Sequence, residues 1–249
     1  MGFNYYRKVA DTQEYLDEKT VDNIIKYNVL PTLASGALLF CVTMFLVNFS
    51  PILSSLIYSI GGMIFSIIFY LGMTIAAYIV SYKKSNNVGL FLFYGSCLAS
   101  GLLQAPVIQF AIMLIGFQDT LVLFSIAVLS ATMALLATWF LVRYTDKFFK
   151  PGEGFKGFGM WIFTLFAMGM MIWVTFSLFY SFTLYLLLSS LVSIFIVGIY
   201  TYYDIRAIRS RVSTGRWVYA TIHLAIDYFI LIVRIFLLLV IGRASSSRR

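Results

Sequence analysis

Two aspartates stand inside apolar sequence near the C-terminal end of this chain. Asp204 closes the segment IYTYYD, and Asp227 lies within HLAIDYFILIVRIFLLLV. An ionisable side chain at membrane depth costs about 2.5–3.5 kcal/mol even on lenient insertion scales, so it is rare and usually functional. Two such acids on consecutive predicted helices indicate one shared site, and a site made of acids suits protons or cations.

Other polar residues accompany the acids. His223 precedes Asp227 by four residues and Arg234 follows it by seven, so all three share one helix face. Asp227 lies about ten residues into its predicted span, roughly 15 Å along the helix. Asp204 stands at the end of the preceding span, and a helix that continues past it brings both acids to one level. We therefore predict that Asp204 and Asp227 form one shared site for protons or cations, with His223 as a secondary pH-sensitive group.

Each of these residues also has a purely structural interpretation. Asp204 can be a helix-end acid that pairs with Arg206 or another loop arginine. Asp227 can form a buried pair with Arg234, and His223 can be a hydrogen-bonded residue at the membrane surface. Two carboxylates in one buried site cannot both ionise freely, while a nearby Lys or Arg opposes that effect. The sequence leaves these alternatives open, with Arg206 and Arg234 as candidate counter-charges.

The elements that must position these residues are membrane-spanning helices. Of the 249 residues, 61% are hydrophobic and 11% are charged, whereas a soluble domain carries about 25% charged residues. Apolar runs of about 20 residues cross a bilayer as helices. We predict an all-α integral membrane protein with seven transmembrane helices. The predicted spans are residues 29–49, 52–80, 88–115, 120–142, 158–178, 182–204 and 217–241.

This pattern predicts one transmembrane domain, residues 29–241, between an N-terminal tail (1–28) and a basic C-terminal tail (242–249). Basic residues gather in the N-terminal tail and in every second loop: Arg7, Lys8, Lys19, Lys26, Lys83, Lys84, Arg143, Lys147, Lys150, Lys156, Arg206, Arg209, Arg211 and Arg216. The positive-inside rule then predicts a cytoplasmic N-terminus. The net charge of +8 thus reflects orientation in a bilayer, and no nucleic-acid partner is expected.

The side of the C-terminus and the identity of the membrane are left open. An odd number of spans places the C-terminus outside, yet its tail carries Arg243, Arg248 and Arg249. The expected location is the plasma membrane if the source is bacterial, and the endoplasmic reticulum or another endomembrane if it is eukaryotic.

Enzyme motifs are absent from the sequence. There is no H-E-x-x-H motif, P-loop or G-x-S-x-G elbow, and both cysteines, Cys41 and Cys97, lie in predicted spans. Intramembrane aspartyl proteases are the nearest enzyme class, since their hallmarks resemble Y-D and G-x-G-D on adjacent helices. Tyr203-Asp204 matches the first, but no glycine stands in the A-I-D sequence that ends at Asp227. We expect no catalytic residues, no enzymatic activity and no cofactor.

Four segments resemble motifs of the Bax inhibitor family of membrane proteins. Tyr203-Asp204 is similar to that family's L-Y-D-T-Q helix end, and LAIDY around Asp227 is similar to its L-Y-L-D-F. Residues 101–106, GLLQAP, are similar to its third-helix G-x-x-L-S-P. RYTDKF (143–148) followed by FKGFG is similar to its T-K-R-D-F-S-x-L-G loop. The four segments occur in the family's order, and the resemblance covers most of the chain from about residue 29 onward.

The resemblance implies a fold of six helices around a central seventh. It also implies a pH-sensitive calcium leak, gated where two acids meet a basic residue from the second helix, and a role in cell-death or stress regulation. Asp204 and Asp227 correspond to the acids, and Lys83, beside Lys84, corresponds to the basic residue. Calcium prefers carboxylate oxygens, for which protons compete, so Ca²⁺ is expected as the ion that these two aspartates bind or pass.

The chain departs from the family pattern at four positions. Ile205-Arg206 replaces the Thr-Gln that usually follows the first acid, and Ile230 replaces an Asn after the second. Lys83 replaces an Arg, so a point charge stands where the family commonly has a planar, forked donor. The acids are intact, but with these departures the resemblance no longer predicts the strength of the gate.

Two other classes of function fit the same sequence. A non-conducting membrane protein can modulate apoptosis or stress factors through helix contacts, with other membrane proteins of cell-death pathways as partners. A proton-coupled transporter instead requires saturable solute uptake that depends on a proton gradient. The expected partners of a leak channel are the lipid bilayer, Ca²⁺ and protons.

Overall fold

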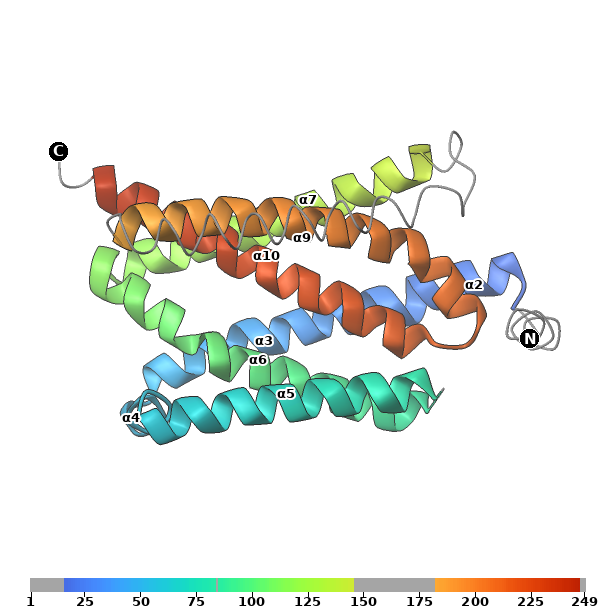
Figure 1. Ribbon diagram of the computed structural model, residues 1–249, viewed down its shortest axis with the longest axis horizontal. Helices are drawn as coiled ribbons and strands as arrows, with labels where there is room; N and C mark the ends of the chain where they lie inside the picture. The colour runs from blue at the N-terminus through green and yellow to red at the C-terminus, as the bar shows by residue number, and fades with distance from the viewer. Residues whose placement is uncertain (1–15, 84, 146–181, 247–249) are drawn as a thin grey trace, which may run out of the picture.

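The computed structural model describes residues 16–83, 85–145 and 182–246, and over these ranges it is helical and has no strand. Six of the described helices are long and apolar enough to cross a membrane, and Figure 1 shows them running together as one elongated bundle. The chain is therefore a multi-pass integral membrane protein. The predicted fifth span, residues 158–178, lies outside the described residues, so the count of seven spans stays a prediction.

The first span is longer than its apolar run. Helix α2 (Glu18–Ile24), the π-helical turn η1 (Ile25–Val29) and α3 (Leu30–Phe49) follow one another without a break. Pro31 lies in the first turn of α3, and a proline ring collides with the carbonyl four residues earlier in a regular helix. The first N–H of α3 instead donates to the carbonyl five residues earlier. The wider turn accommodates the proline, and the helix continues into residues that the hydropathy pattern assigns to the N-terminal tail.

The second predicted span, residues 52–80, is divided in two by the structure. A short helix α4 (Pro51–Ile57) precedes α5 (Ile60–Tyr82). Ser59 caps α5, because its hydroxyl accepts a hydrogen bond from the Gly62 N–H at 3.0 Å. A Cβ at Gly62 would collide with the Leu56 carbonyl oxygen, so only glycine permits this sharp corner. The membrane span therefore begins at Ile60.

The remaining described helices agree with the predicted spans in position but not always in length. Helices α6 (Asn86–Ile115) and α7 (Phe117–Thr145) are joined at Gly116, whose φ of 85° favours glycine. Helices α9 (Phe182–Ser213) and α10 (Trp217–Ser246) are joined by a turn with a second positive-φ glycine. Helix α9 thus runs well beyond residue 204, where hydropathy alone ended it.

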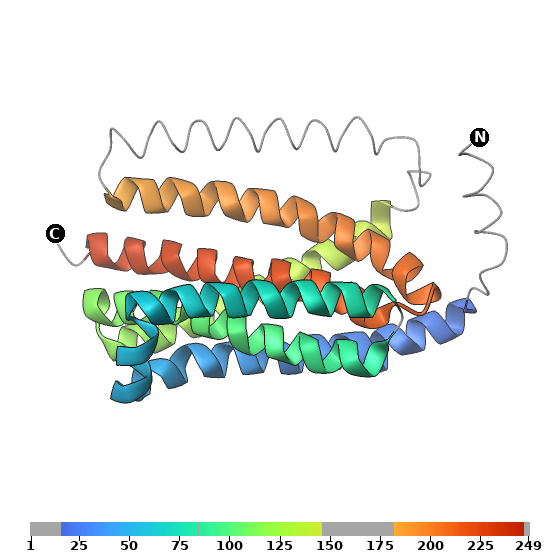
Figure 2. The ribbon, with the colours of Figure 1, turned by 60° about the horizontal axis from the view of Figure 1, so that its bottom comes forward.

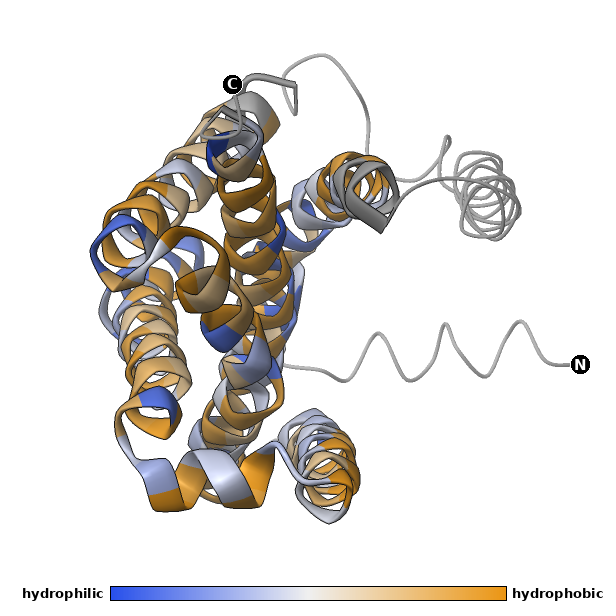
Figure 3. Ribbon diagram, turned by 90° about the vertical axis from the view of Figure 1, so that its left-hand side faces the viewer, coloured by the Kyte–Doolittle hydropathy of each residue, from blue (hydrophilic) through white to orange (hydrophobic). Residues whose placement is uncertain are grey.

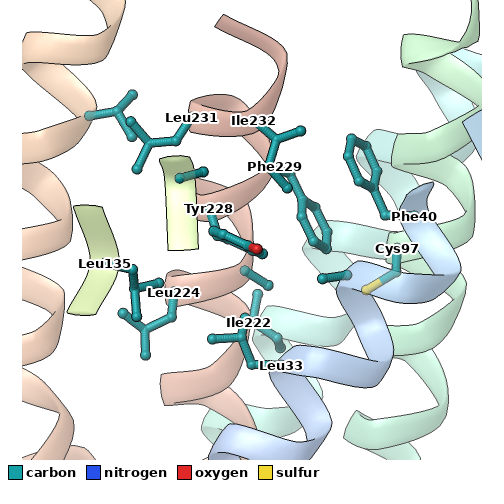
Figure 4. Packing of buried hydrophobic residues seen from close by; sticks show 14 of the residues in the cluster. Leu33, Phe40, Cys97, Leu135, Ile222, Leu224, Tyr228, Phe229, Leu231 and Ile232 are labelled. Carbon is teal, nitrogen blue, oxygen red and sulfur yellow. The ribbon is translucent and has the colours of Figure 1, made fainter. Parts of the chain in front are cut away.

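Among the described helices, the last one, α10, has the most extensive contacts. It packs against η1, α3, α5, α6, α7 and α9, and 67% of its apolar window is buried, against 11–44% for the other spans. Phe229 of α10 stacks on Phe40 of α3 with ring centroids 4.4 Å apart, and Figure 4 shows these rings beside Tyr228 and Ile232. An arrangement of six helices around this one stays a prediction, because one predicted span is not described.

The bundle has two ends that the turns define. Figures 1 and 2 show the α5–α6 and α9–α10 turns together at one end, called here the near end. The α6–α7 turn and the C-terminal end of α10 lie at the far end, where Arg243 pairs with Asp119 at 3.0 Å. Figure 3 shows apolar colour along the outward helix surfaces as well as between helices. These outward surfaces are suited to contact lipid.

Candidate functional site

Asp204 is paired with an arginine of its own helix. Because α9 continues to Ser213, Arg211 lies seven residues after Asp204 and therefore on the same face, two turns later. Side chains of a helix tilt toward its N-terminus, so the arginine reaches back along the helix. Its Nη2 donates to Oδ1 of Asp204 at 2.9 Å, and the two side chains are 23% and 14% exposed. This is a charge-assisted contact largely shielded from solvent.

The next helix supplies a second partner for the same carboxylate. Nδ1 of His223, on α10, lies 3.3 Å from Oδ2 of Asp204. Each oxygen of Asp204 thus has its own nitrogen partner, one on α9 and one on α10. The carboxylate therefore lies in the interface between the two helices, and it joins them.

Asp227 completes the site from α10, one turn after His223. Its side chain is buried, at 8% exposure, and it lies next to the Asp204 carboxyl and the Thr201 hydroxyl. Its Oδ2 is buried without a hydrogen-bond partner among the described residues. The structure therefore brings Asp204, Asp227 and His223 together, as expected from their positions in the sequence.

Aromatic rings enclose the histidine. Tyr78 of α5 and Tyr219 of α10 pack edge-on against His223, with ring centroids 4.9 and 4.7 Å away. The Arg211 guanidinium carbon lies 5.5 Å from the centre of the Tyr219 ring, a distance suited to a cation–π contact. Nε2 of His223 is also buried without a partner among the described residues. The site is thus a small polar cluster inside an aromatic and aliphatic surround.

Three other predicted residues lie in different environments. Lys83 is exposed at the end of α5, and no ion pair to it is found within the described part of the chain. Arg206 is half-buried near Asp204 on α9, and Arg234 is half-buried two turns beyond Asp227 on α10. Arg211 contacts Asp204 directly, which is the loop-arginine alternative left open by the sequence.

Arg211, Thr201 and Tyr78 were not among the residues predicted for the site. The i and i+7 spacing of Asp204 and Arg211 was a usable signal, but it applies only if the helix continues through both. Thr201, one turn before Asp204, carries the signal of a hydroxyl on the same face. For Tyr78 we find no signal in the sequence, because its position depends on how α5 packs against α10.

The near end is tied together by further polar contacts. The Arg216 guanidinium lies over the Tyr82 ring at 4.2 Å, and the Asn86 side-chain amide donates to the Gly215 carbonyl at 3.4 Å. These contacts link the α5–α6 turn with the α9–α10 turn. In addition, Arg209 pairs with two acids of the first span at 3.1 and 2.9 Å. Several separate contacts therefore hold together the helix ends around the carboxylates.

No group of three or more His, Cys, Asp or Glu side chains in the described ranges could hold a metal ion. Calcium takes six to eight oxygen ligands in its usual protein sites. Two carboxylates supply at most four of these oxygens, so a calcium ion held at Asp204 and Asp227 would need further oxygen ligands.

These features define a multi-pass helical membrane protein with a buried pair of acids between its last two helices. The family model described as "Inhibitor of apoptosis-promoting Bax1" matches residues 23–244. The chain belongs to the Bax inhibitor family, a family of membrane proteins linked to cell-death regulation. No curated protein matches the chain.

Proposed function

We propose that this protein is a non-enzymatic, pH-sensitive calcium leak channel in which Asp204 and Asp227 form the gate. The observation that carries the proposal is the unequal environment of the two acids. Asp204 has a cation or a histidine on each oxygen, whereas Asp227 is buried with one oxygen unpartnered within the described structure. Family membership supports the proposal independently.

The chemistry of the cluster suits a switch. A second buried carboxylate beside an ionised one is costly unless a proton or a cation balances it. Arg211 and His223 are directed at Asp204, so Asp227 needs a proton in the closed protein or a cation in the conducting one. Tyr78 and Tyr219 face the same cluster from α5 and α10. Protons and calcium then compete for one place, which couples ion flux to pH.

Orientation and helix number complete the proposal. The near end carries Lys83, Arg209 and Arg216 among its described residues, and we place it in the cytoplasm by the positive-inside rule. The far end, with the paired Asp119 and Arg243, then faces the other side. Seven spans, with α10 at the centre, accord with an N-terminus and a C-terminus on opposite sides.

Calcium flux into proteoliposomes is the direct test. Purified wild-type protein is expected to admit calcium at a rate that changes across about pH 6 to 8, the range over which coupled buried carboxyls can titrate. Asp204→Asn should flatten that dependence, because an amide mimics the protonated acid at every pH. Asp227→Asn should flatten it as well. Asp119→Asn, which neutralises a half-exposed acid at the far end, is the matched control and should leave the profile unchanged.

The outcomes separate the rival functions. Unchanged pH profiles in both Asn variants would show that the acid pair is not the gate. Wild-type protein that conducts no calcium, yet still binds cell-death membrane proteins, would be an interaction protein. Saturable solute uptake that collapses without a proton gradient would identify a transporter.

A further inference from the structure

The charge that balances Asp204 comes from α9 itself. Arg211 is seven residues further along the same helix and contacts Oδ1 at 2.9 Å. Both side chains are mostly shielded from water, so their attraction is weakened less by solvent and salt than that of a surface pair. Lys83, just after the second predicted span and at the end of α5, is exposed. The acid pair can therefore be balanced without a charged residue from α5.

Arg211 also reaches the neighbouring helix. Its guanidinium lies over the ring of Tyr219 on α10, and the carboxylate that it holds also contacts His223 on α10. One side chain of α9 thus stabilises two contacts across the α9–α10 interface. Removal of its charge would loosen the interface that holds both acids.

The same guanidinium is incompletely satisfied. Its Nη1 is buried and has no hydrogen-bond partner among the described residues, which carries a desolvation cost. A structural arginine that served stability alone would usually have its N–H groups paired. Incomplete pairing lowers the cost of moving the guanidinium, which suits a residue that releases its partner when the site changes state.

We propose that Arg211 is the positioning residue that holds the gate closed, by fixing Asp204 against α10. The assignment rests on the proposed leak function and specifies its regulation. Among the described residues, the ionisable groups that face the Asp204–Arg211 pair include Tyr78 from α5 and Tyr219, His223 and Asp227 from α10. Opening then requires separation of Arg211 from Asp204 at the α9–α10 interface.

Calcium leak at neutral pH tests the assignment in a set of matched variants. Arg211→Gln should raise the leak by about tenfold, within the usual range of coupling between contacting residues. Arg211→Lys, which keeps the charge, should restore much of the closed state. Arg209→Gln removes an exposed arginine two residues earlier that pairs with the first span, and it should leave the leak unchanged.

Non-additivity is the decisive result. In an Asp204→Asn background the Arg211→Gln change should add nothing further, because the partner charge is already gone. This double variant also contains no unpaired member of the pair, so it stays measurable even if Arg211→Gln alone folds poorly. Equal effects of Arg211→Gln and Arg209→Gln, or additive effects in both backgrounds, would overturn the proposal.

A second readout separates this proposal from the leak function. Thermal unfolding in detergent gives a double-mutant cycle for Asp204 and Arg211 that needs no conduction. One outcome is that the wild-type protein passes no calcium while Asp204 and Arg211 are still strongly coupled in the free energy of unfolding. That result would refute the leak function and the gate role of Arg211, and it would show that the ion pair only stabilises the fold. Wild-type flux that responds to pH, without coupling between the two residues, would refute the role of Arg211 alone.

Discussion

Neutralising Asp227 should stabilise the protein while it disables the gate. The carboxylate is buried, lies next to Asp204, and has one oxygen without a hydrogen-bond partner in the described structure. In Asp227→Asn an amide replaces that carboxylate, removes a negative charge and can donate to Asp204. Buried ionisable groups of this kind are retained at functional sites despite their cost.

The size of the effect follows from the unpartnered oxygen. A buried polar group without a partner costs about 1–3 kcal/mol, so a gain of about 2 kcal/mol is expected at a pH where the wild-type carboxyl is ionised. Since 1 kcal/mol shifts the melting temperature of a chain of this size by about 2–4 °C, the variant should melt about 4–8 °C higher. At low pH the wild-type carboxyl carries a proton and resembles the amide, so the gain should disappear.

Thermal unfolding in detergent measures this gain. Cys97 is fully buried, so a thiol-reactive dye reports its exposure as the protein unfolds. Asp119→Asn is the control, because it removes a half-exposed pair at the far end whose effect should stay within about 1 kcal/mol. A lower melting temperature for Asp227→Asn at high pH, or a gain that is equal at every pH, would show that the buried carboxylate carries no cost and that the reasoning is wrong.

Three further predictions concern the scaffold. Gly62→Ala should destabilise the protein by about 1–3 kcal/mol, because a Cβ there meets the backbone of α4. The neighbouring Gly61→Ala, with open space around it, should not, and equal melting temperatures would contradict the proposed corner. With both native cysteines removed, single cysteines at Ser213 and Ser245 should be labelled from opposite sides of the membrane, the first from the cytoplasm, because α10 runs from end to end. Labelling of both from one side would contradict that crossing. Asp17 caps α2, and the hydrogen bonds that its carboxylate accepts from Thr20 hold its pKa below 3.8. This stabilisation is present above the unfolded pKa and is lost as pH falls through the folded one, so hydrogen exchange in α2 should accelerate there in wild type but not in Asp17→Ala.

Much of the fold follows from hydropathy, because an apolar run of sufficient length can satisfy its backbone in a bilayer only as a helix. The spans that begin at residues 88, 120 and 217 agree closely with α6, α7 and α10. Hydropathy predicts the ends of the helices less well, because those ends depend on turns and on contacts with neighbouring segments. The corner at Ser59 depends on the close approach of Gly62 to α4, and the start at Glu18 depends on a π-turn that accommodates Pro31.

The sequence by itself determined that two acids lie in apolar helices, that His223 shares a face with Asp227, and that the chain resembles the Bax inhibitor family. These are properties of residue type and of spacing along one helix. Only the tertiary structure decided which cation contacts Asp204. That choice depends on α9 continuing to Arg211, on the reach of a side chain over two turns, and on α10 packing beside it. Spacing along the chain does not fix contacts between helices, because the same apolar faces can pack in several ways until all of them are present together.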